Sequence, residues 1–310
     1  MYDVIGDIHG HAEELRALLS RLGYEEHEGT FRRSGRTAVF LGDFIDRGPA
    51  QRETLRIVRR MIDAGGATSV MGNHELNAIA WYLEDEQRPG EHLRPRTGEV
   101  GRKNHRQHAA FLREVEGDAA LHRELIEWFL TLPLWLELPG IRAIHACWHP
   151  MHMDRLAPRL RDGRFLTREL MQDAARRGTP EYQSVEVLTK GLEVRLPPEC
   201  AYTDKDGHHR AEGRVSWWDP TARTFRDAVM RQSADDPELP DTPLPEEARL
   251  EVSGETPLFV GHYWLSGTPE PRSRKVACVD YSAGKGGPLV AYRWDGETEL
   301  ERDKFVSSRG

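Results

Sequence analysis

Cysteine and long apolar runs are scarce in this sequence of 310 residues. The three cysteines, Cys147, Cys200 and Cys278, are far apart and odd in number, which excludes the disulfide framework of a small secreted domain. The longest apolar runs are about as long as a β-strand, so we predict no transmembrane helix and no membrane partner. Because Met1-Tyr2-Asp3 leads directly into the first expected strand, we expect no signal peptide and predict a cytoplasmic protein with reduced thiols.

An excess of positive charge is also absent. The sequence has 43 Lys and Arg against 51 Asp and Glu, which gives a formal net charge of -8. This balance argues against a protein that binds nucleic acid by neutralising phosphates, so we expect no stable nucleic-acid partner. The net charge does not exclude a local basic groove. The length suits one large domain or two modest ones, and we predict a single domain over 1–310. The sequence leaves the oligomeric state open.

The first 83 residues show alternating strand and helix patterns. Apolar runs predict strands at the start of the chain, at 37–41 and at 68–71. Amphipathic spacing predicts helices between them that end near Gly23 and Gly65, and a third helix over 75–83. Such alternation is typical of a βαβαβ unit with parallel strands and right-handed crossovers.

The remainder of the chain is less regular. Residues 84–107 are rich in Glu, Arg, His, Pro and Gly without a period, and we predict an exposed loop or flap there, with solvated His105 and His108. Helices are expected over about 107–131, followed by a hairpin of 134–138 and 141–145. Residues 149–256 are predicted to be an inserted, cap-like region. Strands are expected again at 258–261, 275–281 and 289–294, with one more strand after them.

Polar side chains follow five of the expected strands, in most cases after a glycine. They are Asp7, His9, Asp43, Asn73, His74, His145 and His262. Because ligand sites of open α/β sheets lie outside the carboxyl ends of the strands, we expect these groups to converge. Carboxylate, amide and imidazole ligands suit divalent cations, and a metal pair needs a bridging carboxylate, for which Asp43 is the natural candidate.

Three blocks among these motifs resemble the signatures of a known family. Gly6-Asp7-Ile8-His9-Gly10, Gly42-Asp43-Phe44-Ile45-Asp46-Arg47-Gly48 and Gly72-Asn73-His74-Glu75 are similar to the blocks of the calcineurin-like metallophosphoesterases. The forms Asp46-Arg47-Gly48 and His74-Glu75 resemble most closely the phosphoprotein phosphatase branch with its bacterial members. The later single-histidine blocks of the family match Ile144-His145 and Gly261-His262. The resemblance covers about 1–83, 134–146 and 257–294.

The resemblance implies a fold and a role for each motif residue. The fold would be an α/β sandwich of two mixed sheets flanked by helices. Asp7, His9, Asp43 and His262 would hold one divalent metal, and Asn73 and His145 would join Asp43 on a second. Mn²⁺ is the expected ion, and Fe or Zn²⁺ also fit these ligands. His74 would be the general acid, oriented by Asp46, Arg47 would bind the phosphate, and a metal-bridging hydroxide would be the nucleophile.

The substrate is left open between several classes. The leading hypothesis is a Ser/Thr phosphoprotein phosphatase acting on phosphate monoesters, and the alternative is a dinucleoside tetraphosphatase or another nucleotide or RNA-end phosphatase. A hypothesis of another class is a non-catalytic regulator that binds metal and phosphate. The family usually has two glycines after the histidine that matches His145, whereas this chain has Ala146-Cys147 there. This difference weakens the assignment of a protein substrate. Arg214 or Lys190 is expected to add a second phosphate contact.

Overall fold

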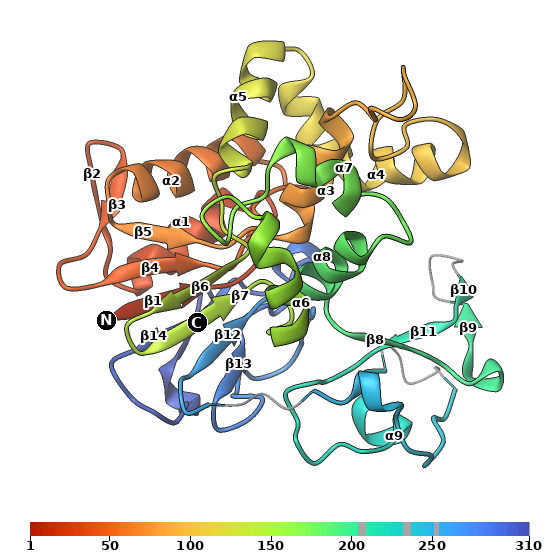
Figure 1. The fold of residues 1–310 in the computed structure, drawn as a ribbon. Helices are drawn as coiled ribbons and strands as arrows, with labels where there is room; N and C mark the ends of the chain where they lie inside the picture. Colours follow the sequence, from red (N-terminus) through yellow and green to blue (C-terminus); the bar gives the residue numbers. More distant parts are fainter. Residues whose placement is uncertain (204–208, 232–236, 251–253, 310) are drawn as a thin grey trace.

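Two mixed β-sheets form the centre of the molecule (Figure 1). The computed structural model describes residues 1–203, 209–231, 237–250 and 254–309. The first sheet has the strand order β15-β14-β1-β4-β5. Its strands are β1 (Tyr2–Ile5), β4 (Thr37–Phe40), β5 (Ala67–Ser69), β14 (Val290–Trp294) and β15 (Phe305–Ser307). The first three run parallel, as the βαβαβ pattern predicted. The expected C-terminal strands are also present: β14 pairs antiparallel with β1, and β15 pairs antiparallel with β14.

The second sheet has four strands in the order β13-β12-β7-β6. They are β6 (Trp135–Leu138), β7 (Ile141–Ile144), β12 (Leu258–Val260) and β13 (Val276–Cys278). The predicted hairpin is the antiparallel pair β6 and β7, whereas β7, β12 and β13 are parallel. Both sheets are therefore mixed, which confirms the predicted fold class. A small hairpin, β2 (Glu25–His27) and β3 (Thr30–Arg32), follows the first helix.

Alternating side chains divide the interior into two layers. Val4 of β1 and Val39 of β4 are fully buried between the two sheets, together with Phe259 of β12. Their neighbours Ile5 and Phe40 belong to the other apolar cluster, which includes the buried faces of the helices. Successive side chains of a strand point to opposite faces, so strands buried on both sides read as continuous apolar runs. This burial explains why the strands preceding the polar motifs were recognisable in the sequence.

Helices cover the outer faces of the sheets (Figure 1). They include α1 (Ala12–Arg21), α2 (Gln51–Asp63), α3 (Asn73–Tyr82), α4 (Gly98–Val115) and α5 (Ala119–Phe129). The first three confirm the helices predicted from amphipathic spacing, and Leu15, Leu18 and Leu19 of α1 are fully buried.

Helix α4 corrects the prediction for 84–107. The helix begins at Gly98, so about two fifths of the segment predicted as loop is helical, and His108 is fully buried instead of solvated. The buried face of α4 includes Gly101 and Asn104 as well as His108 and Phe111. Because half of that face is small or polar, the segment lacks the apolar period by which a helix is recognised.

The segment between β7 and β12, predicted to be an insertion and called the insertion below, connects two strands that are neighbours in one sheet. Its elements are α6 (Pro150–Leu156), α7 (Arg168–Ala174), α8 (Pro180–Lys190), β8 (Glu193–Arg195), β9 (Tyr202–Thr203), β10 (His209–Arg210), β11 (Glu212–Arg214) and α9 (Phe225–Ala228), with short 3₁₀ turns at 157–159, 198–200 and 246–248. Further 3₁₀ turns outside the insertion lie at 283–285 and 302–304. The strands β8 to β11 and helix α9 lie to one side of the sheets in Figure 1.

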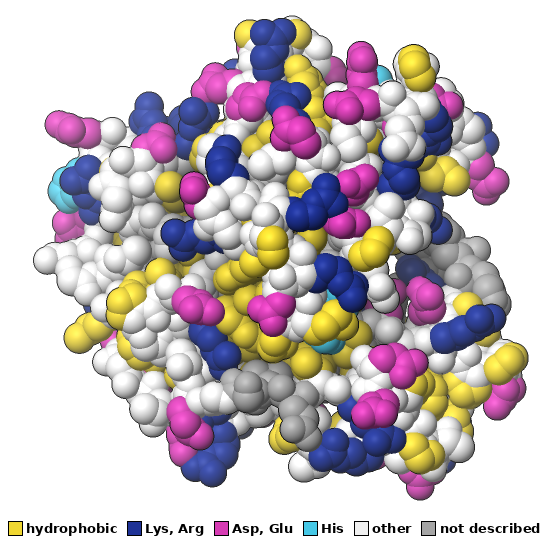
Figure 2. All heavy atoms as spheres, in the orientation of Figure 1, with side chains coloured by type: hydrophobic (Ala, Val, Ile, Leu, Met, Phe, Trp, Pro, Cys, Tyr) yellow, Lys and Arg dark blue, Asp and Glu magenta, His cyan; other side chains and the backbone are white. Residues whose placement is uncertain are grey.

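The surface and the thiols agree with the composition. Figure 2 shows acidic and basic side chains interspersed over one face of the molecule. All three cysteines are free and buried, as the prediction of reduced thiols required. Within the described part of the chain, every helix is too short or too polar to cross a bilayer.

Candidate metal centre and active site

The polar residues that follow β1, β4, β5, β7 and β12 come together where these strands end. Asp7, His9, Asp43, His145 and His262 are each at most 6% exposed. His9, Asp43 and His262 also have a positive φ, of 49°, 50° and 71°. Non-glycine residues rarely adopt this conformation, and it costs of order 1 kcal/mol each, so the surrounding structure must impose it. The strand ends thus hold the expected ligands in a tightly constrained cluster.

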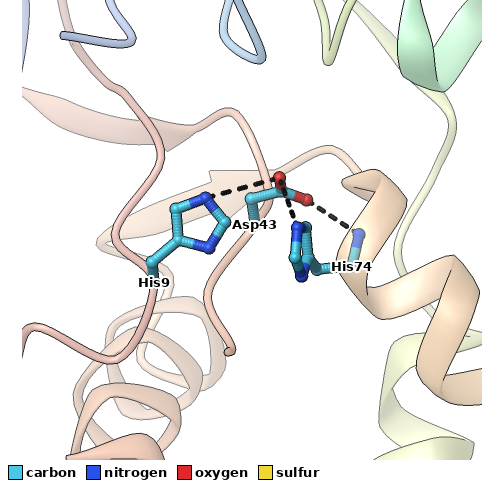
Figure 3. A group of neighbouring side chains, drawn as sticks. All are labelled: His9, Asp43 and His74. Atoms are coloured by element: carbon cyan, nitrogen blue, oxygen red, sulfur yellow. Dashed lines mark hydrogen bonds and ion pairs between the residues drawn. The ribbon is translucent and has the colours of Figure 1, made fainter. Parts of the chain in front are cut away.

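Asp43 lies at the centre of this cluster. Figure 3 shows its carboxylate between the rings of His9 and His74. Its Oδ2 is 3.7 Å from His9 Nε2 and 3.9 Å from His74 Nε2. Its Oδ1 is 3.5 Å from His145 Nε2 and accepts a 2.9 Å hydrogen bond from the backbone N–H of His74. One carboxylate that faces ring nitrogens on both sides is the arrangement that two neighbouring cations require.

The rings of His145 and His262 form the second side of the cluster with Asn73. Asn73 Oδ1 is 2.8 Å from His262 Nδ1 and 3.3 Å from His145 Nε2. Ligand atoms of Asp43, His145 and His262 all lie within 4.8 Å of one another. The resemblance placed His262 with Asp7 and His9, whereas the structure groups its ring with Asn73 and His145. The backbone N–H of His262 donates to Asp7 Oδ2 at 3.0 Å.

Several buried polar atoms of the cluster accept or donate no hydrogen bond in the described part of the chain. They are Asp7 Oδ1, His9 Nε2 and His262 Nε2. An unsatisfied buried polar atom costs about 1–3 kcal/mol, so three of them around one carboxylate indicate a missing partner. His9 Nδ1 donates to Ile45 O at 2.9 Å and His145 Nδ1 donates to Leu41 O at 2.5 Å, which leaves both Nε2 lone pairs for a metal. The residues present fit the two divalent cations that the motifs imply.

The electrostatics favour the ligand forms of His9, His262 and Asp43, whereas burial and the nearby Asp280 raise the pKa of Asp7. Burial and the nearby His74 lower the pKa of His9 to about 4, and burial together with Arg214 lowers the pKa of His262. Burial would raise the pKa of Asp43, but His145 and His74 outweigh it and hold that pKa well below its usual range. Metals bind neutral imidazole and ionised carboxylate, so His9, His262 and Asp43 are in the forms that bind cations, and a bound cation would offset the repulsion at Asp7.

Asp46 connects the ring of His74 to a second histidine. Asp46 Oδ2 is 2.5 Å from His74 Nδ1, and Asp46 Oδ1 is 2.9 Å from His108 Nδ1. Burial lowers the pKa of His74, but the carboxylates of Asp43 and Asp46 outweigh it and raise that pKa overall. A histidine whose Nδ1 is held by a carboxylate can present a proton at Nε2.

Glu75 and Gly72 fix the loop that carries Asp43. Glu75 accepts hydrogen bonds from the backbone N–H groups of Asp43 and Phe44, both at 2.8 Å, and of Gly72 at 3.0 Å. A Cβ on Gly72 would overlap Asp43 N and Oδ1. Glu75 lies in the first turn of α3, as expected. Its larger contribution, as the acceptor for a loop 31 residues earlier, could not be read from its helix position.

Arg47 is exposed beside the cluster and contacts an aromatic ring that the sequence did not single out. Its Cζ is 5.6 Å from the centre of the Trp264 ring, and Lys285 Nζ is 4.1 Å from the same centre. The Trp264 ring also stacks on His9, with a centroid distance of 5.2 Å. Asp280 holds both loops, since it accepts from Trp264 N at 2.7 Å and from Ser282 N at 2.9 Å.

The two candidates for a second phosphate contact lie in different settings. Arg214 has Cζ at 5.5 Å from the Tyr263 ring, and its Nε is buried without a hydrogen bond in the described part of the chain. The pKa of His262 is lowered mainly by burial and secondly by the positive charge of Arg214. Lys190 instead pairs with Glu186 on the same helix. Of the two, Arg214 is the one whose charge is shown to act on a proposed metal ligand.

Comparisons with known proteins agree with the motifs. Residues 2–186 match the family model of the calcineurin-like phosphoesterases. An asymmetrical bis(5′-nucleosyl)-tetraphosphatase of Bacillus velezensis is 44% identical over 84 residues, which are 27% of this chain and 33% of that protein. A symmetrical bis(5′-nucleosyl)-tetraphosphatase of Aromatoleum aromaticum is 34% identical over 142 residues, which are 46% of this chain and 42% of that protein.

Similar coverage holds for a third relative, and one solved structure shows the fold. The asymmetrical enzyme of Oceanobacillus iheyensis is 32% identical over 46% of this chain and 54% of its own length. The matches thus span between a third and about half of these relatives. The crystal structure of a mutant cold-active protein tyrosine phosphatase aligns with 99% of this chain and 80% of its own, with a TM-score of 0.50 and 16% identity. With the family model covering more than half of the sequence, the chain belongs to the calcineurin-like phosphoesterase family.

Proposed function

We propose that this protein is a metal-dependent hydrolase of phosphoric esters and anhydrides. The observation that carries the proposal is the Asp43 carboxylate, which has His9 and His74 on one oxygen and His145 on the other. The non-catalytic alternative would be favoured by the loss of a ligand or of the proton donor. All of the motif residues are present and lie together, which supports catalysis.

Two groups of residues would hold the cations. Asp7, His9 and Asp43 would hold the first, and Asp43, Asn73, His145 and His262 the second. This division follows the ring positions and moves His262 from the first ion to the second. Mn²⁺ stays the preferred ion, with Fe or Zn²⁺ as alternatives. When bound, the two cations supply positive charge that stabilises the transition state and lowers the pKa of attacking water.

The remaining steps belong to side chains of the chain itself. His74 would protonate the leaving oxygen from Nε2, which lies on the Asp43 side, while Asp46 holds its Nδ1. The exposed guanidinium of Arg47 would bind two oxygens of the substrate phosphate. Arg214 would add a second cation from the insertion. General acid catalysis of this kind contributes roughly 10²–10⁴-fold to a rate.

For the substrate, we favour a nucleotide with several phosphates, such as a dinucleoside tetraphosphate. Arg47 and Lys285 both lie against Trp264, whose ring stacks on the ligand His9. Two cations on one side of the centre suit a substrate that carries phosphates beyond the reacting one. The names of the relatives from Bacillus velezensis and Aromatoleum aromaticum point to the same class. The Ser/Thr phosphoprotein phosphatase that we first favoured becomes the second candidate, carried by Asp46-Arg47-Gly48 and His74-Glu75.

The test is a comparison of substrates with metal-stripped protein reloaded with Mn²⁺. Phosphate or nucleotide release is measured with diadenosine tetraphosphate, phosphopeptides, and 5′- and 3′-phosphorylated oligonucleotides. We expect the dinucleotide to have the highest kcat/KM. Preferential turnover of phosphopeptides would restore the protein-phosphatase hypothesis, and no turnover with Mn²⁺, Fe²⁺ or Zn²⁺ would favour the binding-only hypothesis.

A matched pair of lysine variants tests the substrate class separately. Lys285→Met should raise KM for diadenosine tetraphosphate several-fold and leave p-nitrophenyl phosphate turnover nearly unchanged, because only the larger substrate has a second phosphate. Lys304→Met is the control, since that lysine pairs with Asp295. Equal behaviour of the two variants with the dinucleotide would contradict the proposed contact.

The cytoplasmic location stays a prediction.

A further inference from the structure

His108 is a buried titratable residue that the proposed reaction does not use directly. It is fully buried on the inner face of α4, and its ring packs 4.9 Å from that of Phe111. Its Nδ1 donates to Asp46 Oδ1 at 2.9 Å, while the other oxygen of Asp46 holds His74. The carboxylate therefore has a histidine on each side. Burying a polar ring costs free energy, and this ring donates its hydrogen bond to the Asp46 carboxylate. The reason for placing a histidine here therefore lies in that bond.

Helix α4 contacts the Asp46 segment by a second route. Glu114 of α4 accepts hydrogen bonds from Gln51 N at 2.8 Å and Arg52 N at 2.9 Å, at the start of α2. Gln51 Oε1 in turn accepts the backbone N–H of Asp46 at 2.7 Å. Asp46 has a φ of 70°, a conformation that only surrounding contacts maintain in a non-glycine residue. One helix thus fixes both the backbone and the side chain of Asp46.

We propose that His108 is a positioning residue for proton transfer, which locks the Asp46 carboxylate so that Asp46 can orient His74. A carboxylate with only His74 as partner could rotate about its last torsion and move Oδ2 away from Nδ1. The bond from His108 fixes the plane of that carboxylate. His74 Nε2 then stays on the side of Asp43, at 3.9 Å.

The charge of Asp46 agrees with this role. Burial would raise its pKa, but His108 and His74 outweigh burial and hold the pKa below its usual range. Asp46 therefore stays ionised, which keeps a proton on His74 Nδ1 and fixes the orientation of that ring. The inference rests on the proposed phosphoester hydrolysis and adds α4 to its machinery.

The test compares two aryl phosphates that differ in their need for a proton. p-Nitrophenolate leaves readily without one, whereas phenolate gains from protonation by a general acid. Two variants separate the hydrogen bond from the packing. His108→Phe keeps a ring and removes the donor, and His108→Asn removes the ring and keeps an amide N–H near the position of Nδ1. His122→Phe is the matched control, because His122 also packs on Phe111.

We expect His108→Phe to lower kcat for phenyl phosphate about tenfold more than for p-nitrophenyl phosphate, with unchanged metal content. His108→Asn should recover most of the difference, and His122→Phe should show none. In a His74→Asn background, the His108→Phe change should cost nothing further, because its route of action is already lost. The double variant also distinguishes this result from partial unfolding, because unfolding caused by His108→Phe would lower kcat further in the His74→Asn background.

Other results would overturn the inference. Equal losses for both esters in His108→Phe would assign His108 a packing role, and so would a further loss in the His74→Asn background. Wild-type kinetics in His108→Phe would show that Asp46 needs no second partner. Failure of the Mn²⁺-loaded wild type on both esters and on diadenosine tetraphosphate would instead overturn the proposed hydrolysis, and this inference with it.

Discussion

Gly261→Ala is the sharpest probe of the metal centre, because the change adds one methyl group beside a ligand. A Cβ at this position would overlap Asp7 Oδ1. The φ of Gly261 lies outside the left-handed region, so alanine meets no backbone penalty and the effect is steric. To make room, either the Asp7 carboxylate or β12 must move. Movement of Asp7 breaks its 3.0 Å hydrogen bond from His262 N.

The magnitude follows from these two contributions. Overpacking a close-packed site costs about 1–3 kcal/mol, and the loss of one hydrogen bond adds about 0.5–1.5 kcal/mol. We therefore expect Gly261→Ala to lower the free energy of unfolding by about 1.5–4.5 kcal/mol. Since Asp7 is a proposed ligand of the first metal, affinity for that ion should fall roughly 10–100-fold, as it does when partners that orient a ligand are lost.

Urea unfolding of the metal-free protein gives the first quantity, and metal titration gives the second. Gly117→Ala is the control, because a Cβ there meets nothing within 4 Å. That variant should be neutral or slightly stabilising. Wild-type stability and full occupancy of both metals in Gly261→Ala would refute the placement of Asp7 against β12.

Three further predictions concern the ligands, the proton donor and pH. Asp43→Asn should lose at least one of two bound metals by elemental analysis, since it removes the shared charge; two metals per chain would contradict the bridging role. His74→Ala should lower kcat for a monoester by roughly 10²–10⁴-fold while metal content stays intact, and unchanged kcat would exclude His74 as general acid. Burial, followed by His108, lowers the pKa of His122 to about 4 from its ordinary 6.5. The folded state therefore binds this proton less readily than the unfolded one, so stability is complete above pH 6.5 and falls as pH drops toward 4. Between pH 7 and 5, urea unfolding should show wild type losing about 1–2 kcal/mol relative to His122→Phe, and parallel pH curves would contradict the buried neutral ring.

The sequence by itself determined the strands, the ligands and the family. Strands buried on both faces read as apolar runs, and the chain must turn where each run ends, so Asp7, Asp43 and His145 could be placed at strand ends from local pattern. A glycine directly before a ligand is also visible in the sequence. The structure gives the reason: a Cβ on Gly72 would overlap Asp43, and a Cβ on Gly261 would overlap Asp7.

Only the tertiary structure decided how those residues are grouped and which others join them. His262 Nδ1 lies 2.8 Å from Asn73 Oδ1, across 189 residues of sequence, and no local spacing encodes that contact. His108 contacts Asp46, which is 62 residues earlier in the sequence. Because the buried face of its helix is partly small and polar, the sequence pattern predicted a solvated side chain. Trp264 and Lys285 meet because Asp280 holds their loops together. Side chains with no local signature obtain their roles from packing between distant elements, and that packing is fixed only when the chain has folded.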